Sequence, residues 1–445
     1  MDATQLLPQF GNLAFTLLAF VVALSIIVAI HEYGHYIVGR WTGIHAEVFS
    51  LGFGPVLFSR SDRHGTRWQV AALPFGGYVK FLGDANAASM GGAEGSVPAR
   101  ERRHTMLGAP LWARAATVAA GPVANFLLSI LLFAALIMAQ GRPSEPLTVA
   151  ALAPLPASES QGLRVGDEIL AVEGQPIGAA ETGVYTLGEL PNEATLDYTV
   201  RRDGADIVVP GPHPLSPVVG AVTPDSAAWD VGMRAGDVVI GVDGAPVATF
   251  DQLVDSVLAS DGRVLSLEVW RDGADLDFAV VPRSTDLPLT DGGFETRWLV
   301  GLSPGLVFEP ATVTPGPLAA LGDAATQLGF VLRSSLSGLG HMITGAISTC
   351  NLSGPVGIAE ASGAMASQGA QSFLWFVAVL SAAVGLMNLF PIPVLDGGHL
   401  VFHAWEAITG RPPGDRALRV LMAAGLSLIL MLTVFAIAND LFLCP

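Results

Sequence analysis

Four stretches of this chain are long enough and apolar enough to cross a lipid bilayer as helices. A hydrocarbon core about 30 Å thick requires roughly 20 predominantly apolar residues. The stretches that meet this requirement without any Asp, Glu, Lys or Arg are residues 13–30, 115–139, 373–395 and 420–439. The chain is also only 14% charged, whereas proteins of average composition are about 25% charged. We therefore predict a polytopic α-helical membrane protein.

The predicted organisation contains four transmembrane helices, a loop region and an outer segment. The transmembrane helices are placed at residues 1–40, 112–141, 371–399 and 418–443. The first is expected to be a retained span and not a cleaved signal peptide, because residues 1–12 hold no Lys or Arg and no small-residue cleavage site precedes His31. The two cysteines, Cys350 and Cys444, are too few for a disulfide framework, and we expect ordinary apolar side chains.

Basic residues gather in two loops. Of the 22 Lys and Arg residues, nine lie in residues 40–114 and three in residues 396–419. Residues 141–370 hold the other ten, against 28 Asp and Glu. Because an excess of Lys and Arg marks cytoplasmic loops, we expect both basic loops in the cytoplasm and both termini and the acidic segment outside. An acidic exterior argues against nucleic-acid binding.

The acidic segment contains an internal repeat. The sequence GLRVGDEILAVEGQPI at residues 162–177 recurs as GMRAGDVVIGVDGAPV at residues 232–247. Each copy is followed by RDGAD, at residues 202–206 and 271–275. A repeat of this length predicts two tandem copies of one domain.

We place the two copies at residues 146–212 and 213–284. In each, glycines with Asp167 or Asp237 predict a tight turn before a short apolar strand. The copies resemble PDZ domains of bacterial membrane-associated and periplasmic proteases. A duplicated β-domain without a peptide-binding site is the alternative.

Two further regions are expected to be structured. Residues 41–111 are expected to form a membrane-associated β-hairpin region, because EVFSLGFGPVLFSR and TRWQVAALPFGGYVKFLG are rich in β-branched and aromatic residues and are joined by the polar turn SDRHG. Residues 285–370 are expected to include an amphipathic helix on the outer face, within residues 312–348. Simple packing of that helix onto the bundle is the alternative.

The first apolar stretch ends in SIIVAIHEYGHYIVGRW, which carries His31, Glu32 and His35. On a helix, a spacing of four places both imidazoles on one face, one turn apart. Two such imidazoles can bind one zinc ion, with Glu32 beside them to accept a proton from water. Charged residues at the centre of a membrane helix cost about 2.5–3.5 kcal/mol each and usually mark a function. The alternative is that these three polar side chains lie just past the end of the membrane span and reach the membrane–water interface.

A catalytic zinc ion commonly has three protein ligands, so a third must come from another element. The third stretch continues into NLFPIPVLDGGHL, and Asp396 is the one carboxylate in these apolar surroundings. Both stretches run inward and would bring their polar groups to the same depth. His399 competes for the third position. We favour Asp396 as ligand and assign His399 a supporting or structural role.

Several motifs follow one another over essentially the whole chain: HEYGH, GFGP, PFGGYVKF, GPVANF, the tandem repeats, LSGPVGIAE and NLFPIPVLDGG. Together they resemble the site-2 protease family of intramembrane zinc metalloproteases. The resemblance implies a Zn²⁺ cofactor bound by His31, His35 and Asp396, with Glu32 as catalytic base. It also implies a bacterial inner-membrane protein with periplasmic PDZ domains and an active site near the cytoplasmic side. Tyr33 stands where many members have Phe, which leaves the ligands untouched.

The resemblance implies single-pass membrane substrates that another protease has already trimmed, such as anti-sigma factors, and remnant signal peptides. A transmembrane helix must unwind before cleavage, because its backbone groups are hydrogen-bonded to one another. An edge strand around residues 72–80, including Gly76, Gly77 and Tyr78, could pair with the extended substrate. We expect Asn388 and Pro391 to contact the substrate backbone. A packed hairpin and a helix-capping Asn388 are the alternatives.

Other protein classes share part of this pattern. A catalytically silent, membrane-anchored PDZ scaffold needs only the outer repeat and leaves HEYGH and LDGG unexplained. A zinc transporter needs a polar path through several spans, and the second and fourth spans offer little beyond Asn125. The PDZ pair itself is expected to filter substrates by size or to read a newly exposed C-terminus.

Overall fold

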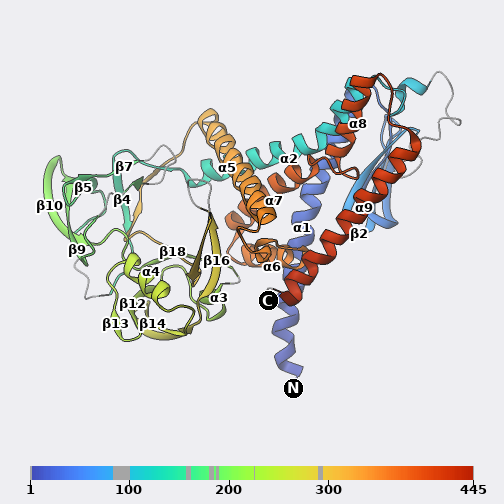
Figure 1. The fold of residues 1–445 in the computed structure, drawn as a ribbon. Coiled ribbons are helices and arrows are strands. Elements are labelled where there is room, and N and C mark those ends of the chain that lie inside the picture. Colours follow the sequence, from blue (N-terminus) through green and yellow to red (C-terminus); the bar gives the residue numbers. More distant parts are fainter. Residues whose placement is uncertain are drawn as a thin grey trace. The chain divides into compact units, whose positions relative to one another are not determined.

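The computed structural model describes residues 3–83, 101–156, 162–179, 185–186, 190–224, 226–288 and 294–443. The chain divides into two compact units. The membrane unit comprises Met1–Leu136, Pro317–Gly340 and Thr349–Pro445, and the β-rich unit comprises Ile137–Gly316 and His341–Ser348. Figure 1 shows the long helices of the first and the short strands of the second.

The membrane unit is built on four helices that are long and apolar enough to cross a membrane. They are α1 (Ala3–Trp41), α2 (Leu111–Gln140), α7 (Ala370–Asn388) and α9 (Asp415–Ala438). Large apolar side chains such as Leu18 and Leu131 are more than half exposed, as expected of helices that face lipid. The predicted set of four membrane helices is therefore found. The other helices are α5 (Pro317–Thr344), α6 (Pro355–Ser367), α8 (Asp396–Thr409) and the short η2 (Arg102–His104), η3 (Thr349–Asn351) and η4 (Asn439–Leu443).

The third membrane helix ends earlier than the sequence suggested. It stops at Asn388 and not at residue 399, because Pro391 and Pro393 cannot donate the backbone hydrogen bonds that would continue it. A new helix, α8, begins at Asp396, so the expected loop at residues 396–419 contains a helix. A Cβ atom on Gly397 would lie 2.3 Å from the carbonyl oxygens of Leu389 and Phe390. Only glycine lets the chain fold back this closely on the end of α7.

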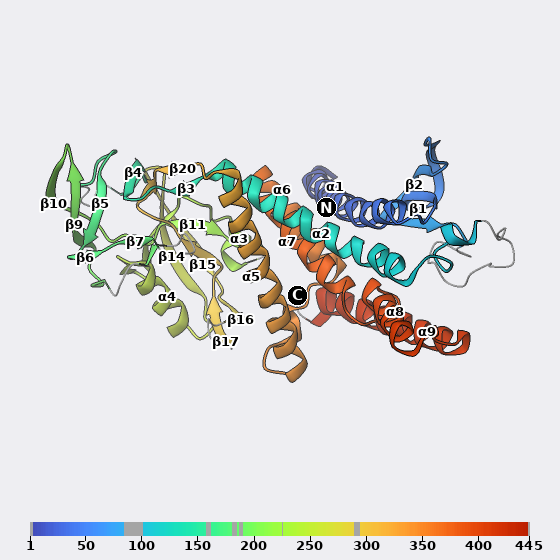
Figure 2. The same cartoon turned by 90° about the horizontal axis from the view of Figure 1, so that it is seen from above.

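The expected β-hairpin lies beside α1 (Figure 2). It consists of β1 (Ala46–Ser61) and β2 (Arg67–Phe81), paired antiparallel. Residues 48–51 of β1 pair both with residues 67–70 and with residues 77–80 of β2. Aromatic packing of Tyr36 against Phe49 and Trp68 joins the hairpin to the helix that carries His31 and His35.

The carboxylate of Asp62 connects the turn of this hairpin to α1 through hydrogen bonds. Asp62 accepts hydrogen bonds from the Tyr36 hydroxyl at 3.1 Å and the Trp68 indole nitrogen at 3.0 Å. It also accepts from the backbone N–H groups of His64 and Thr66 at 2.8 and 3.0 Å. The hairpin is thereby fixed next to the last turns of α1.

The β-rich unit consists of short strands with two small helices. Its largest sheet has the strand order β10-β9-β5-β4-β19, with β6 paired to β5, and a second sheet has the order β13-β12-β14-β15. The pairs β11-β18, β16-β17, β20-β3 and β7-β8 complete it. The bounds are β3 Arg142–Pro143, β4 Leu147–Leu152, β5 Glu168–Val172, β6 Gln175–Pro176, β7 Gly178–Ala179, β8 Tyr185–Thr186, β9 Thr195–Arg202, β10 Ala205–Pro212, β11 Val219–Val222, α3 Ala227–Asp230, β12 Val238–Val242, β13 Ala245–Pro246, α4 Phe250–Ala259, β14 Leu265–Arg271, β15 Ala274–Val280, β16 Arg283–Pro288, β17 Phe294–Leu299, β18 Leu302–Pro304, β19 Phe308–Pro310 and β20 Thr312–Val313.

The shared motifs of the two sequence repeats form the same internal ion pair in each repeat. Arg202 donates to both carboxylate oxygens of Asp167, each at 2.7 Å. Arg271 donates to both oxygens of Asp237 at 2.6 and 2.7 Å. Both Asp side chains are 1% exposed. The arginine of each RDGAD motif therefore stabilises the tight turn at the start of the same repeat.

The ends of the repeats differ from the boundary expected at residue 284. Strand β18 pairs with β11 of the second repeat, and β19 pairs with β4 of the first. Residues 302–310 thus complete sheets in both repeats. This follows from pairing between strands far apart in the chain, which local sequence patterns do not report.

Cys350 is disulfide-bonded, so the expectation of an ordinary apolar side chain was wrong. The chain has one other cysteine, Cys444, which lies outside the described residues.

Candidate metal centre

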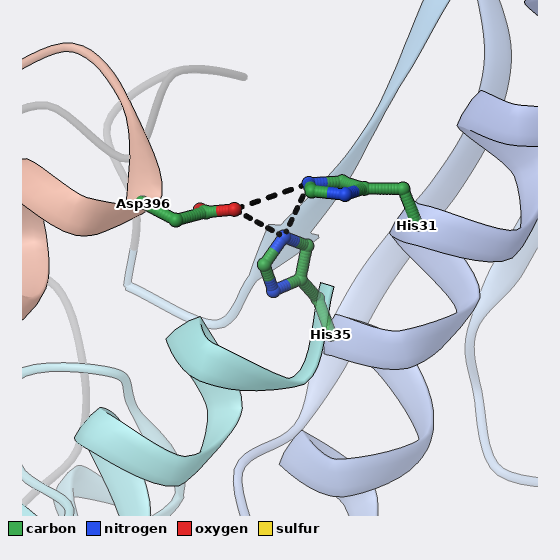
Figure 3. A group of neighbouring side chains, drawn as sticks. All are labelled: His31, His35 and Asp396. Carbon is green, nitrogen blue, oxygen red and sulfur yellow. Dashed lines mark hydrogen bonds and ion pairs between the residues drawn. The ribbon is translucent and has the colours of Figure 1, made fainter. Parts of the chain in front are cut away.

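Three side chains converge inside the membrane unit. His31 and His35 come from α1 and Asp396 from the first turn of α8, and Figure 3 shows them pointing toward one another. The Asp396 Oδ2 atom lies 3.1 Å from His31 Nε2 and 3.5 Å from His35 Nε2. The two Nε2 atoms are 3.1 Å apart. In the described part of the chain, this is the group of His, Cys, Asp and Glu residues that could hold a metal ion.

The local sequences of α1 and α2 explain how His31 and His35 are placed. The i, i+4 spacing stacks the imidazoles of His31 and His35 on one face of α1. Helix α2 lies directly against that face at Gly121, where a Cβ atom would be 2.4 Å from His35 Nε2 and 2.8 Å from His31 Cε1. The glycine of GPVANF therefore leaves room for both rings.

The donor set fits a metal ion. The Nδ1 atom of His35 lies 2.8 Å from the Thr117 carbonyl oxygen, which can only accept a hydrogen bond. Its Nδ1 therefore carries the proton, and its Nε2 lone pair points toward Asp396. The buried Asp396 Oδ2 atom faces both histidines and has no other polar partner among the described residues. Nitrogen and carboxylate lone pairs directed at one point are typical of a zinc site.

His399, the competitor for the third position, is not part of this group. Its ring packs edge-on against Phe402, with centroids 6.0 Å apart, and its backbone N–H bonds to the Leu395 carbonyl. Between the two candidates, the fold brings Asp396 to the histidines.

Glu32 lies beside the three side chains and under the hairpin. A Cβ atom on Gly77 would be 3.3 Å from Glu32 Cγ and 3.0 Å from Val28 Cγ1. Strand β2 therefore passes directly over the proposed base.

The other candidate residues lie around this centre. Gly76 adopts a positive φ of 134°, and a Cβ there would clash with the Phe53 ring at 2.5 Å. Tyr78 stacks on Phe53 and accepts a hydrogen bond from Gln69. Asn388 donates to the Val384 carbonyl of its own helix at 3.0 Å, and Pro391 is exposed between α7 and α8. Their proposed contacts with substrate remain predictions.

Two features of the centre were not anticipated. Asn125, fully buried in α2, places its carboxamide nitrogen 3.2 Å from His31 Nδ1. Arg114 forms a two-pronged ion pair with Glu406 of α8, at 2.6 and 3.0 Å. For the Asn125 contact, the sequence signal was a polar residue inside the apolar motif GPVANF. For the Arg114–Glu406 ion pair, no local sequence pattern indicated that the two residues would meet.

Comparison with known proteins agrees with this centre. The chain matches Peptidase family M50 over residues 19–432. Proteins named "Putative zinc metalloprotease" from Rhizobium meliloti (strain 1021) and Agrobacterium fabrum are 38% and 36% identical, over 97% of both chains in each case. A Salmonella typhi protein named "Regulator of sigma E protease" is 32% identical over 96% of this chain and 99% of its own. The chain therefore belongs to peptidase family M50, which confirms the family resemblance of the motifs.

Proposed function

We propose that this protein is an intramembrane zinc metalloendopeptidase that cleaves single-pass transmembrane substrates. The observation that carries the proposal is the convergence of His31, His35 and Asp396 from two helices, at the end of an apolar membrane helix. Membership of a metallopeptidase family supports it.

The residues of the metal centre have different roles in the proposed peptide hydrolysis. His31, His35 and Asp396 would hold zinc, which supplies Lewis-acid polarisation of the scissile carbonyl. Glu32 accepts a proton from the attacking water and delivers it to the leaving amine. The C–O bond to the water oxygen forms first, and the C–N bond then breaks as the proton taken from water is delivered to the amine nitrogen.

The edge of the hairpin supplies a place for an unwound substrate. Residues 77–80 pair with β1 on one side, and no further strand joins this sheet among the described residues. An extended substrate segment added at this edge would regain the backbone hydrogen bonds lost on unwinding. Because a Cβ atom on Gly77 of this edge would lie 3.3 Å from Glu32 Cγ, that segment would lie beside the proposed base.

The β-rich unit is proposed to be a tandem PDZ pair that limits access by size or binds a trimmed C-terminus. We further propose a bacterial inner-membrane location, with both termini and the β-rich unit in the periplasm. The disulfide at Cys350 supports an outer position for residues 349–351 of the membrane unit, because disulfides persist in oxidising compartments such as the periplasm.

Replacing the proposed base tests the function. We expect Glu32→Gln to retain zinc and to stop cleavage, since the amide cannot accept the proton. Cleavage is followed by mass spectrometry of membrane fragments from cells that express wild type or variant. Glu168→Gln is the matched control, because Glu168 forms a half-exposed pair with Arg201 in the β-rich unit. A Glu32→Gln protein that still generated the fragments would refute the assignment, and a wild-type protein without zinc would favour the scaffold.

A further inference from the structure

The two histidines of the metal centre have different partners behind them. His35 Nδ1 faces the Thr117 carbonyl at 2.8 Å, and a carbonyl can only accept a hydrogen bond. His31 Nδ1 faces the Asn125 carboxamide at 3.2 Å, which offers a donor at one end and an acceptor at the other. The tautomer of His35 is therefore fixed by the backbone, whereas the tautomer of His31 depends on a side chain.

The orientation of that carboxamide decides whether His31 can bind a metal. With the Asn125 N–H groups facing Nδ1, His31 must carry its proton on Nε2, where it faces Asp396 Oδ2 at 3.1 Å. A protonated Nε2 has no lone pair for a cation. Rotating the carboxamide by half a turn exchanges oxygen and nitrogen at the same place. The oxygen then accepts from Nδ1–H and leaves Nε2 free to act as ligand.

The surroundings of Asn125 favour this second arrangement once a metal is held. The side chain is 0% exposed, and its Oδ1 atom has no hydrogen-bond partner among the described residues. A buried carbonyl oxygen without a partner costs about 1–3 kcal/mol. Turning this oxygen toward His31 gives it a donor in Nδ1–H, and the amide N–H groups then occupy the position that the oxygen leaves. The backbone of Asn125 stays in place meanwhile, because its carbonyl accepts a hydrogen bond from Ser381 of α7 at 2.9 Å.

We propose that Asn125 is a positioning residue of the metal centre, whose carboxamide oxygen accepts the Nδ1 proton of His31 and thereby directs its Nε2 lone pair to the metal. The inference rests on the proposed zinc site and assigns Asn125 no contact with substrate. Partners of this kind on the far side of a ligating histidine typically change metal affinity by about 10–100-fold when removed.

Zinc binding by three variants of the full-length protein tests this role. Asn125→Leu keeps the side-chain volume but offers no hydrogen-bond acceptor, whereas Asn125→Asp keeps an acceptor. Ser129→Ala is the control: it removes a buried hydroxyl one turn further along α2 that has no hydrogen-bond partner among the described residues. Zinc affinity and the rate of zinc loss to a chelator are measured in detergent, with thermal unfolding of the metal-free proteins as a check on folding. We expect Asn125→Leu to lower zinc affinity by about 10–100-fold and Asn125→Asp and Ser129→Ala to stay within a few-fold of wild type.

The outcomes separate this inference from the proposed function. If wild type binds zinc and a folded Asn125→Leu protein binds it equally well, the positioning role is wrong and the zinc site stands. Equal losses in the Leu and Asp variants would also overturn it, because the acceptor would then not matter. If wild type takes up no zinc, both the proposed function and this inference fail. Should Asn125→Leu prove unfolded, ¹⁵N shifts of the His31 ring in zinc-loaded wild type decide: a protonated Nδ1 supports the inference, and a protonated Nε2 contradicts it.

Discussion

At the residue scale, the metal centre depends on the absence of side chains as much as on their presence. Gly121 lets the His31 and His35 rings lie against α2, and Gly34 lets α1 approach the Ala120 carbonyl, which would be 2.3 Å from a Cβ atom. The glycines of LDGG likewise allow the turn that delivers Asp396. Packing this tight cannot absorb even one methyl group without displacing a neighbour.

The sharpest residue-scale prediction concerns Gly121. We expect Gly121→Ala to abolish zinc binding and cleavage, because its methyl group would overlap both imidazoles. Zinc content of the purified variant is the measurement. Gly322→Ala in α5 is the matched control, since a Cβ there meets nothing within 4 Å and should leave zinc unchanged. Normal zinc content in the Gly121→Ala variant would show that the rings are not held as described.

At the scale of elements, hydrogen-bonded carboxylates organise turns and helix starts. Asp167 and Asp237 brace the opening turn of each repeat. Asp440 accepts hydrogen bonds from the backbone N–H groups of Gly354, Val356 and Gly357 at 2.8, 3.1 and 3.0 Å. The motif LSGPVGIAE is thus a helix start whose cap comes from η4, which follows α9.

The ion pair of the first repeat makes the stability of that repeat depend on pH. Hydrogen bonds from Arg202 lower the pKa of Asp167 in the folded protein. A lowered folded pKa means that the stabilisation is present above the unfolded carboxyl pKa, about 4, and is lost as the pH falls through the folded value. We expect Asp167→Asn to increase hydrogen–deuterium exchange in β5 and β9 at pH 7 and to flatten its acid dependence. Asp206→Asn, in an exposed pair with Arg201, should do neither.

The cap of α6 can be removed alone. We expect Asp440→Ala to cost about 1 kcal/mol and to speed amide exchange at the start of α6, because three backbone N–H groups lose their acceptor. Hydrogen–deuterium exchange of residues 354–358 measures this. Asp415→Ala at the exposed start of α9 is the control. Unchanged protection in α6 would mean that the cap contributes nothing.

At the scale of the whole membrane unit, the centre is assembled from segments that meet only in the folded chain. Helix α1 supplies two proposed ligands, α8 the third, and α2 their supporting contacts. The Arg114–Glu406 pair holds α8 to α2, with side chains 11% and 19% exposed. This pair fixes the helix that begins with Asp396.

Removing one partner of this pair should destabilise the membrane unit, whereas replacing both partners by apolar residues should restore most of its stability. We expect Glu406→Met to destabilise the unit by about 3–5 kcal/mol, because Arg114 keeps a buried charge without its partner. The double variant Arg114→Met and Glu406→Met should recover most of that loss, because an apolar pair needs no counter-charge. Thermal unfolding and zinc content of both variants check this. Equal losses in the two variants would contradict it.

The sequence by itself determined whatever depends on neighbouring residues. Apolar length gave the four membrane helices, and helix periodicity placed His31 and His35 on one face. Tertiary structure decided the rest: whether Asp396 or His399 joins the histidines, where α7 ends, how residues 302–310 complete both repeats, and which side chain faces His31 from behind. The physical reason is that local patterns encode the direction of a side chain along its own element. The partner it meets is set by packing between distant segments.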